Sequence, residues 1–254
     1  MTVVLYYHQL GTEPSPLAVS PALFSEHLAV VAESGLRVVT AAELADAVRE
    51  GSDVSDLVAI TFDDGFAAAV SEAATRLAAA EMRATFFCVA GHLGGRSDWP
   101  SRLPDAPVEP LATADDLRTL AAGGHEIGSH GWTHAPLDGA ADLERELVAS
   151  RRALEDAVGA EVRTFAYPYG ALPSAAAARV VAATYEAAYT TRIGRVSADS
   201  SRFELPRVDA HYVRDPRVLR RVLAGALDTY LGFRRLGSRT RRALRKDYVA
   251  VGAA

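Results

Sequence analysis

Two short runs of the sequence carry side chains that could bind a metal ion and move protons. The run TFDDG, residues 61–65, places two adjacent carboxylates directly after an apolar stretch. His130 and His134 are four residues apart, so they lie on one face of a helical turn or converge from a tight loop. Imidazole is the commonest metal ligand, and two histidines with one carboxylate leave a position open for water or substrate. That donor set is typical of catalytic rather than structural zinc.

Each of these features also has a simpler interpretation. A single aspartate after a strand often caps the next helix, but two aspartates followed by a glycine fit that role less well. Adjacent residues on an extended chain point to different sides, so Asp63 and Asp64 can have different functions. An isolated H-x-x-x-H pair is weak evidence for a metal site, because surface histidines explain most such pairs. Here both motifs follow predicted strand ends, where catalytic groups of parallel α/β folds collect, which favours one shared site.

Three further segments could contribute to that site. Pro168 and Gly170 flank Tyr169, which suggests a fixed turn whose backbone N–H could face an oxyanion, although these aromatics could equally be core. His8 follows the first predicted strand and is a candidate general acid, although a lone histidine is usually structural. The long loop Gly91–Leu111 contains Trp99, which could stack on a sugar ring or fill a hydrophobic gap.

Short apolar runs alternate with helical patterns along the whole chain, which predicts an α/β fold of one domain. We expect strands over Val3–Tyr7, Leu36–Val39, Leu57–Phe62, Arg83–Val89, His125–Ile127, Arg163–Ala166, Ala187–Thr190 and Glu204–Ala210. We expect helices over Pro21–Ser34, Ala41–Glu50, Ala67–Ala80, Ala114–Ala122, Ala141–Val158 and Ser174–Ala183. Repeated β–α units with about seven parallel strands favour an irregular (β/α) barrel over an open sheet. We assign residues 1–232 to the barrel and 233–254 to a basic tail.

Composition excludes several classes of function. The 254 residues hold 27 basic and 32 acidic side chains, a net charge of −5 that argues against general nucleic-acid binding. The only cysteine, Cys88, rules out an internal disulfide and a cysteine-rich zinc site, and its apolar surroundings predict burial. The N-terminus lacks the features of a signal peptide, and no segment is long and apolar enough to span a bilayer. We therefore expect a soluble, cytoplasmic protein.

The predicted tail is strongly basic. Its basic residues are Arg234, Arg235, Arg239, Arg241, Arg242, Arg245 and Lys246. A solvated helix end or a disordered tail is the favoured interpretation. The alternative is peripheral contact with an anionic membrane surface at the inner face of the cell membrane, which would suit a lipid-linked substrate.

Taken together, the TFDDG run, the H-x-x-x-H pair and the F-x-Y-P-Y-G turn resemble, in this order, the polysaccharide deacetylase (NodB-homology) family, carbohydrate esterase family four. The resemblance covers roughly residues 3–212. It implies an irregular (β/α) barrel and the metal-assisted removal of N- or O-acetyl groups from sugars. It further implies that Asp63 is the catalytic base and that Asp64, His130 and His134 bind the metal. Tyr169 matches the residue whose backbone N–H helps to bind the oxyanion.

The sequence departs from the family pattern at several positions. Ala166 stands where many members have an arginine that orients the base, and the late Asp/Trp and Leu-x-His motifs are not evident. The Tyr7-His8 pair resembles a circularly permuted branch that includes deacetylases of poly-N-acetylglucosamine, and this implies that His8 is the catalytic acid. Arg207 could replace the missing arginine, and Asp209 or His211 could tune His8. A core or capping role for these last three residues is an equal alternative.

The resulting hypothesis is a metal-dependent hydrolase that removes N-acetyl groups from an amino-sugar-containing glycan or glycoconjugate. Zinc is the default metal for this donor set, which would also accept cobalt, nickel or manganese. One alternative is an intracellular deacylase or deformylase of a small or lipid-linked amide. Another is a catalytically inactive barrel that binds carbohydrate, although a binding module would not need Asp63.

Overall fold

The computed structural model describes residues 1–12, 17–102 and 107–226, and in this part of the chain seven parallel strands form a closed ring. Strand β1 (Val3–Tyr7) closes the ring by pairing with both β5 (Leu57–Phe62) and β10 (Leu205–Asp209). Between β5 and β10 run, in order, β6 (Thr85–Cys88), β7 (Glu126–Ser129), β8 (Thr164–Ala166) and β9 (Ala187–Ile193). The prediction of a one-domain (β/α) barrel with about seven parallel strands is confirmed.

Two smaller pieces of sheet lie beside this ring. The predicted strand at residues 36–39 is β4 (Arg37–Val39), which pairs with the first half of β5 and does not interrupt the ring. Strands β2 (Gln9–Leu10) and β3 (Ala18–Val19) form a short parallel pair of their own, which sequence patterns did not predict. A two-residue strand carries too little alternation to be recognised.

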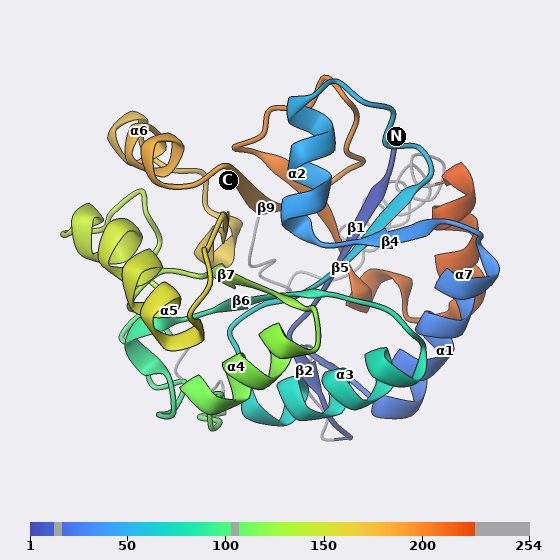
Figure 1. The fold of residues 1–254 in the computed structure, drawn as a ribbon, viewed down its shortest axis with the longest axis horizontal. Helices are drawn as coiled ribbons and strands as arrows, with labels where there is room; N and C mark the ends of the chain where they lie inside the picture. The colour runs from blue at the N-terminus through green and yellow to red at the C-terminus, as the bar shows by residue number, and fades with distance from the viewer. Residues whose placement is uncertain (13–16, 103–106, 227–254) are drawn as a thin grey trace, which may run out of the picture.

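The helices other than α2 (Ala41–Arg49) lie around the outside of the strands (Figure 1). In chain order, the helices are α1 (Pro21–Glu33), α2, α3 (Ala67–Ala79), α4 (Ala114–Ala122), α5 (Ser150–Val158), α6 (Ala175–Thr184) and α7 (Pro216–Arg221). Local chemistry determines several of their starts. Thr40 and Thr113 each form a capping box, and Ser20 caps α1 directly before a proline.

Two helical segments differ from the prediction. The helix expected from Ala141 starts later, because the Asp142 carboxylate accepts the Arg145 N–H at 3.0 Å and an aspartate caps better than an alanine. Its first part, Glu144–Ala149, is a π-helix that continues into α5. Helix α7 was not predicted, although Asp215 caps it and a proline follows.

Strand alternation sorts the core into two layers. One set of side chains fills the ring interior together with α2, including Val4, Phe87 and Tyr189. The alternate set packs between the ring and the outer helices and includes the buried Cys88, as expected. Helix α2 closes the N-terminal end of the ring, where the Ala42 N–H donates to Glu126 at 2.8 Å. The opposite, C-terminal end is therefore the one available for chemistry.

Two further expectations concern the basic tail and membrane-spanning segments. The basic tail, residues 233–254, lies outside the described residues. Among the helices of the described chain, none has the length and apolar character needed to cross a bilayer.

Candidate active site

The C-terminal ends of the strands bring the candidate residues to one edge of the ring. Asp63 and Asp64 directly follow β5, and His130 directly follows β7. His8 directly follows β1, and Tyr169 lies in a 3₁₀ turn, Pro168–Gly170, just after β8. Because all strands of the ring are parallel, these positions share one rim.

Asp64, His130 and His134 form a compact buried cluster at this rim. One donor atom from each of the three lies within 4.8 Å of the other two. The Asp64 Oδ1 atom lies 3.1 Å from His134 Nε2 and 3.4 Å from His130 Nε2. All three side chains are buried, so no bulk water compensates their polar atoms.

The chemistry of this cluster fits a cation. The Nδ1 of His130 lies 2.8 Å from the carbonyl oxygen of Ala166 and donates its proton there, so the neutral ring has its lone pair on Nε2. That lone pair faces the Asp64 carboxylate, whose Oδ1 is buried without a hydrogen-bond partner among the described residues. With both rings neutral, these electron pairs converge and repel one another, and a positive charge among them, from a proton on a ring or from a metal ion, removes the repulsion. The cluster could therefore hold a divalent metal.

The backbone at the site is held in unusual conformations. Within the described residues, four non-glycine residues have a left-handed φ, and three of them are Asp64 (72°), His134 (57°) and Tyr169 (58°). Such conformations cost energy and persist only where surrounding structure imposes them. Their concentration at the rim indicates that side-chain direction there is imposed by the fold.

Asp63 points into the ring, where it meets Arg207. The Nη1 and Nη2 atoms of Arg207 donate to Oδ1 and Oδ2 of Asp63, each at 2.7 Å. Arg207 is fully buried, donates from Nε to the Thr190 carbonyl at 3.0 Å, and lies over the Tyr6 ring at 4.5 Å. The guanidinium thus holds the carboxylate in one orientation.

This pairing determines the ionisation of Asp63. Burial alone would raise the pKa of the Asp63 carboxyl, but the charge of Arg207, the nearby His130 and the Arg207 hydrogen bonds outweigh burial. The pKa of Asp63 therefore lies below its ordinary value. Burial likewise opposes ionisation of Asp64, and the two histidines outweigh it, so the pKa of Asp64 lies well below its ordinary value.

His8 stands on the same rim without a hydrogen bond in the described structure. Its ring contacts the Tyr6 ring edge-on at 5.6 Å, and its charge contributes to lowering the pKa of both Asp63 and Asp64. Asp209 does not bond to His8. It accepts the His211 N–H at 2.8 Å and caps a short 3₁₀ helix, the capping alternative raised above. His211 contacts the neighbouring Tyr212 ring at 5.9 Å.

The long loop after β6 forms one wall of the site. Trp99 is buried, and its ring lies 4.5 Å from the His134 ring. Ser101 donates to the His134 carbonyl at 2.8 Å, and the Tyr169 hydroxyl donates to the Ser101 carbonyl at 2.7 Å. Trp99 therefore packs on a candidate metal ligand, in agreement with the gap-filling interpretation.

Tyr169 itself is partly exposed, and its N–H, in the first turn of the 3₁₀ helix, has no acceptor within that helix.

Two contributors were missed by the sequence interpretation. The Ala166 carbonyl orients His130, and a backbone carbonyl has no residue signature to recognise. Glu146 is a buried carboxylate that bonds to the turn between the two histidines. Its position in a predicted helix gave no indication of this, because the contact joins two separate segments.

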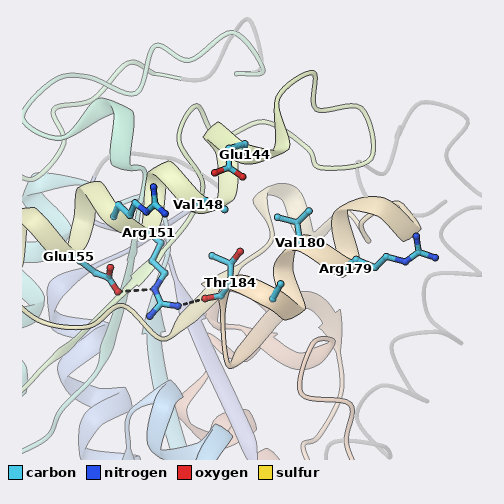
Figure 2. Close-up of a pocket in the computed structure, with 9 residues that line it drawn as sticks. Glu144, Val148, Arg151, Glu155, Arg179, Val180 and Thr184 are labelled. Carbon is cyan, nitrogen blue, oxygen red and sulfur yellow. Dashed lines mark hydrogen bonds and ion pairs between the residues drawn. The ribbon is translucent and has the colours of Figure 1, made fainter.

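A separate hollow lies on the outer surface between α5 and α6 (Figure 2). Arg151 spans it, donating to the Glu155 carboxylate at 2.8 Å and to the Thr184 carbonyl. None of the rim residues lines this hollow, so it is distinct from the candidate active site.

Comparison with known proteins identifies the family of this chain. A family model described as polysaccharide deacetylase matches residues 50–188, more than half of the chain. The chain belongs to the polysaccharide deacetylase family. The match includes the aspartates, the histidine pair and Tyr169, whereas His8 and Arg207 lie outside it. Membership implies a carbohydrate substrate.

Individual relatives are similar over most of this chain. YxkH of Bacillus subtilis (strain 168), provisionally named as a polysaccharide deacetylase, is 24% identical over 208 residues, 81% of this chain and 70% of that protein. IcaB from Ammonifex degensii is 22% identical with a TM-score of 0.70, covering 89% of this chain and 97% of that one. BA0330 from Bacillus anthracis is 24% identical with a TM-score of 0.68, covering 82% of this chain and 64% of that one. At these identities, the two solved structures support the fold.

Proposed function

We propose that this protein is a metal-dependent hydrolase that removes N-acetyl groups from an amino-sugar-containing glycan. One observation carries the proposal. In a chain of the polysaccharide deacetylase family, an ionised carboxylate held by Arg207 lies on the same rim as a buried Asp-His-His cluster with converging lone pairs. Asp63 thus adjoins the proposed metal ligands Asp64, His130 and His134, and a deacetylase needs both.

The metal would be held by Asp64, His130 and His134, with zinc the expected ion. A divalent cation there would polarise the acetamide carbonyl and lower the pKa of the attacking water. The His130 ring is already oriented for this, because its Nδ1–H donates to the Ala166 carbonyl and turns Nε2 toward Asp64.

Three groups on the rim would move protons and stabilise charge. Asp63 accepts a proton as water attacks the acetyl carbon, and its low pKa keeps it ionised and ready to do so. The Tyr169 N–H donates to the carbonyl oxygen as negative charge develops there. His8 then gives a proton to the nitrogen as the C–N bond breaks, so that a neutral amine departs. Arg207 orients Asp63 and takes the place of the arginine that many family members have where this chain has Ala166.

This arrangement argues against an inactive carbohydrate-binding barrel. Burying Asp63 against Arg207 requires desolvating two charges, a cost that a binding module would have no reason to bear. An enzyme acting on a small or lipid-linked amide would use the same rim. That candidate becomes an outcome of the experiment below.

The test measures acetate released by the purified protein with added zinc. Substrates run from the N-acetylglucosamine monomer to the pentamer, and Asp63→Asn and His8→Asn are compared with Asp115→Asn, which changes an exposed carboxylate on α4. We expect release to rise with chain length, to vanish in Asp63→Asn with zinc still bound, and to fall about 10²–10⁴-fold in His8→Asn. Unchanged turnover in folded Asp63→Asn would refute its role as base. If the zinc-loaded wild type releases no acetate, the N-acetyl glycan substrate is wrong and a small or lipid-linked amide becomes the proposed substrate.

A further inference from the structure

Glu146 is a buried carboxylate outside the proposed ligand set, and within the described residues its side-chain hydrogen bonds all go to one turn. Its Oε2 accepts the N–H groups of Trp132 at 2.9 Å and Thr133 at 3.0 Å, and its Oε1 accepts the Thr133 hydroxyl. Within the described residues it has no ion-pair partner. The turn between His130 and His134 therefore supplies its hydrogen-bond donors.

The turn is held from its opposite side as well. The Gly131 and Trp132 carbonyls accept the N–H groups of Ala90 at 2.9 Å and Gly91 at 3.0 Å. Glu146 binds the N–H side and the segment after β6 binds the carbonyl side, so the peptide units are fixed in orientation. The fit is close, since a Cβ on Gly131 would lie 3.0 Å from Glu146 Oε2.

The orientation of the His134 ring depends on this turn more than the orientation of the His130 ring does. His130 has its own outer hydrogen bond from Nδ1 to the Ala166 carbonyl, whereas His134 Nδ1 is buried without a partner among the described residues. A metal-binding histidine is usually oriented by such a bond. His134 instead sits on a left-handed backbone, φ 57°, so the conformation of the preceding residues, together with the Trp99 ring packed against it, determines where its ring points.

We propose that Glu146 is a positioning residue for the metal centre, acting through the Trp132 and Thr133 amides to hold His134 at its distance from Asp64 and His130. The inference rests on the proposed metal site. The π-helix that carries Glu146 supports it, because this segment is locally wider than an α-helix and such bulges recur at functional sites. The Ser150 hydroxyl donates to the Glu146 carbonyl at 2.6 Å, which stabilises the widened turn.

The chain offers a matched control in Glu126. This carboxylate also accepts one backbone N–H, from Ala42 at 2.8 Å, and two hydroxyls, from Thr85 at 2.8 Å and Thr164 at 2.6 Å. It lies at the opposite end of the ring, at the start of β7. Loss of either carboxylate should destabilise the fold, but only loss of Glu146 should disturb the metal ligands.

The experiment compares zinc affinity in wild type, Glu146→Ala, Glu146→Gln and Glu126→Ala, by competition with a chromophoric chelator, together with the visible spectrum of the cobalt-substituted proteins. We expect Glu146→Ala to lose about tenfold to a hundredfold in zinc affinity and to change the cobalt spectrum. Glu126→Ala should do neither. Glu146→Gln should be rescued, because its amide oxygen still accepts the two N–H groups and the Thr133 hydroxyl can turn to accept from its NH₂.

The outcomes separate this inference from the proposed function. Zinc binding by Glu146→Ala equal to that of a zinc-binding wild type would overturn the role of Glu146 and leave the metal site intact. A wild type that binds no zinc would overturn the metal site and the inference with it. If Glu146→Ala fails to fold, Thr133→Val against Thr133→Ser decides: the serine keeps the hydroxyl, and equal zinc affinity of the two variants would overturn the inference.

Discussion

Arg207→Met is the perturbation whose consequences the structure specifies most fully. The arginine is 0% exposed and Asp63 is 2% exposed. Methionine fills much of the same volume but removes both bonds to Asp63 and those to Thr61 and Thr190. Removing one partner of a buried ion pair leaves the other charge uncompensated, which costs about 3–5 kcal/mol of unfolding free energy. For a chain of this size that corresponds to a fall of about 6–20 °C in Tm.

The stability loss of Arg207→Met should also depend on pH. In the wild type the folded pKa of Asp63 lies below its unfolded value of about 3.9, so its stabilising contribution is complete above that pH and is lost only in stronger acid. Without Arg207, burial becomes the main influence and should raise the folded pKa above the unfolded one. Its contribution is then present at low pH and lost as pH rises. The stability deficit of Arg207→Met should therefore grow as the pH rises from about 4, the unfolded pKa of the carboxyl, toward neutral.

The assay is urea unfolding across that pH range with a chelator present, so that metal binding does not contribute. Asp63→Asn and the double variant complete a thermodynamic cycle. We expect the double variant to be less damaged than the sum of the single variants, with a coupling of about 2–3 kcal/mol. A deficit for Arg207→Met below about 1 kcal/mol, or one that is constant with pH, would refute the electrostatic reasoning.

Three further predictions concern the metal, the core and a helix cap. Adding zinc to a free concentration of about a hundred times its Kd should raise the unfolding free energy by about 2.7 kcal/mol, measured by calorimetry, and His130→Ala should lose this gain. Gly128→Ala should cost about 1–3 kcal/mol in urea unfolding, because its Cβ would lie 2.5 Å from the Phe87 ring inside the barrel. Gly139→Ala, whose Cβ would meet nothing within 4 Å, is its control and should be close to neutral. Thr113→Ala should cost about 1 kcal/mol by removing the cap of α4, with acetate release per folded molecule unchanged.

Much of the fold follows from local features of the sequence. The capping threonines at positions 40 and 113 start their helices where predicted, because a cap bonds to backbone only a few residues away. The strand that ends at Phe62 was predicted with its observed bounds, since its continuous apolar run is typical of a buried parallel strand. Boundaries failed where competing local signals existed, as at Asp142.

The composition of the rim also followed from sequence, but its pairings did not. Strand ends with Asp63, Asp64, His130 and His8 could be placed on one edge because parallel strands in a closed ring share that edge. The sequence left open whether Arg207 contacted anything at this site. Its partner Asp63 is 144 residues away, and only closure of the ring through β1 places β10 across from β5.

The contacts of Glu146 likewise separate what the sequence determines from what the tertiary structure decides. By itself the sequence determined that the chain is a barrel with a metal-type donor set, because strand periodicity, caps and ligand types are properties of short segments. Tertiary structure alone decided that a π-helix brings Glu146 to the Trp132 and Thr133 amides, and that Trp99 packs on His134. The orientation of buried polar groups depends on the packing of segments distant in sequence, and no local pattern encodes it.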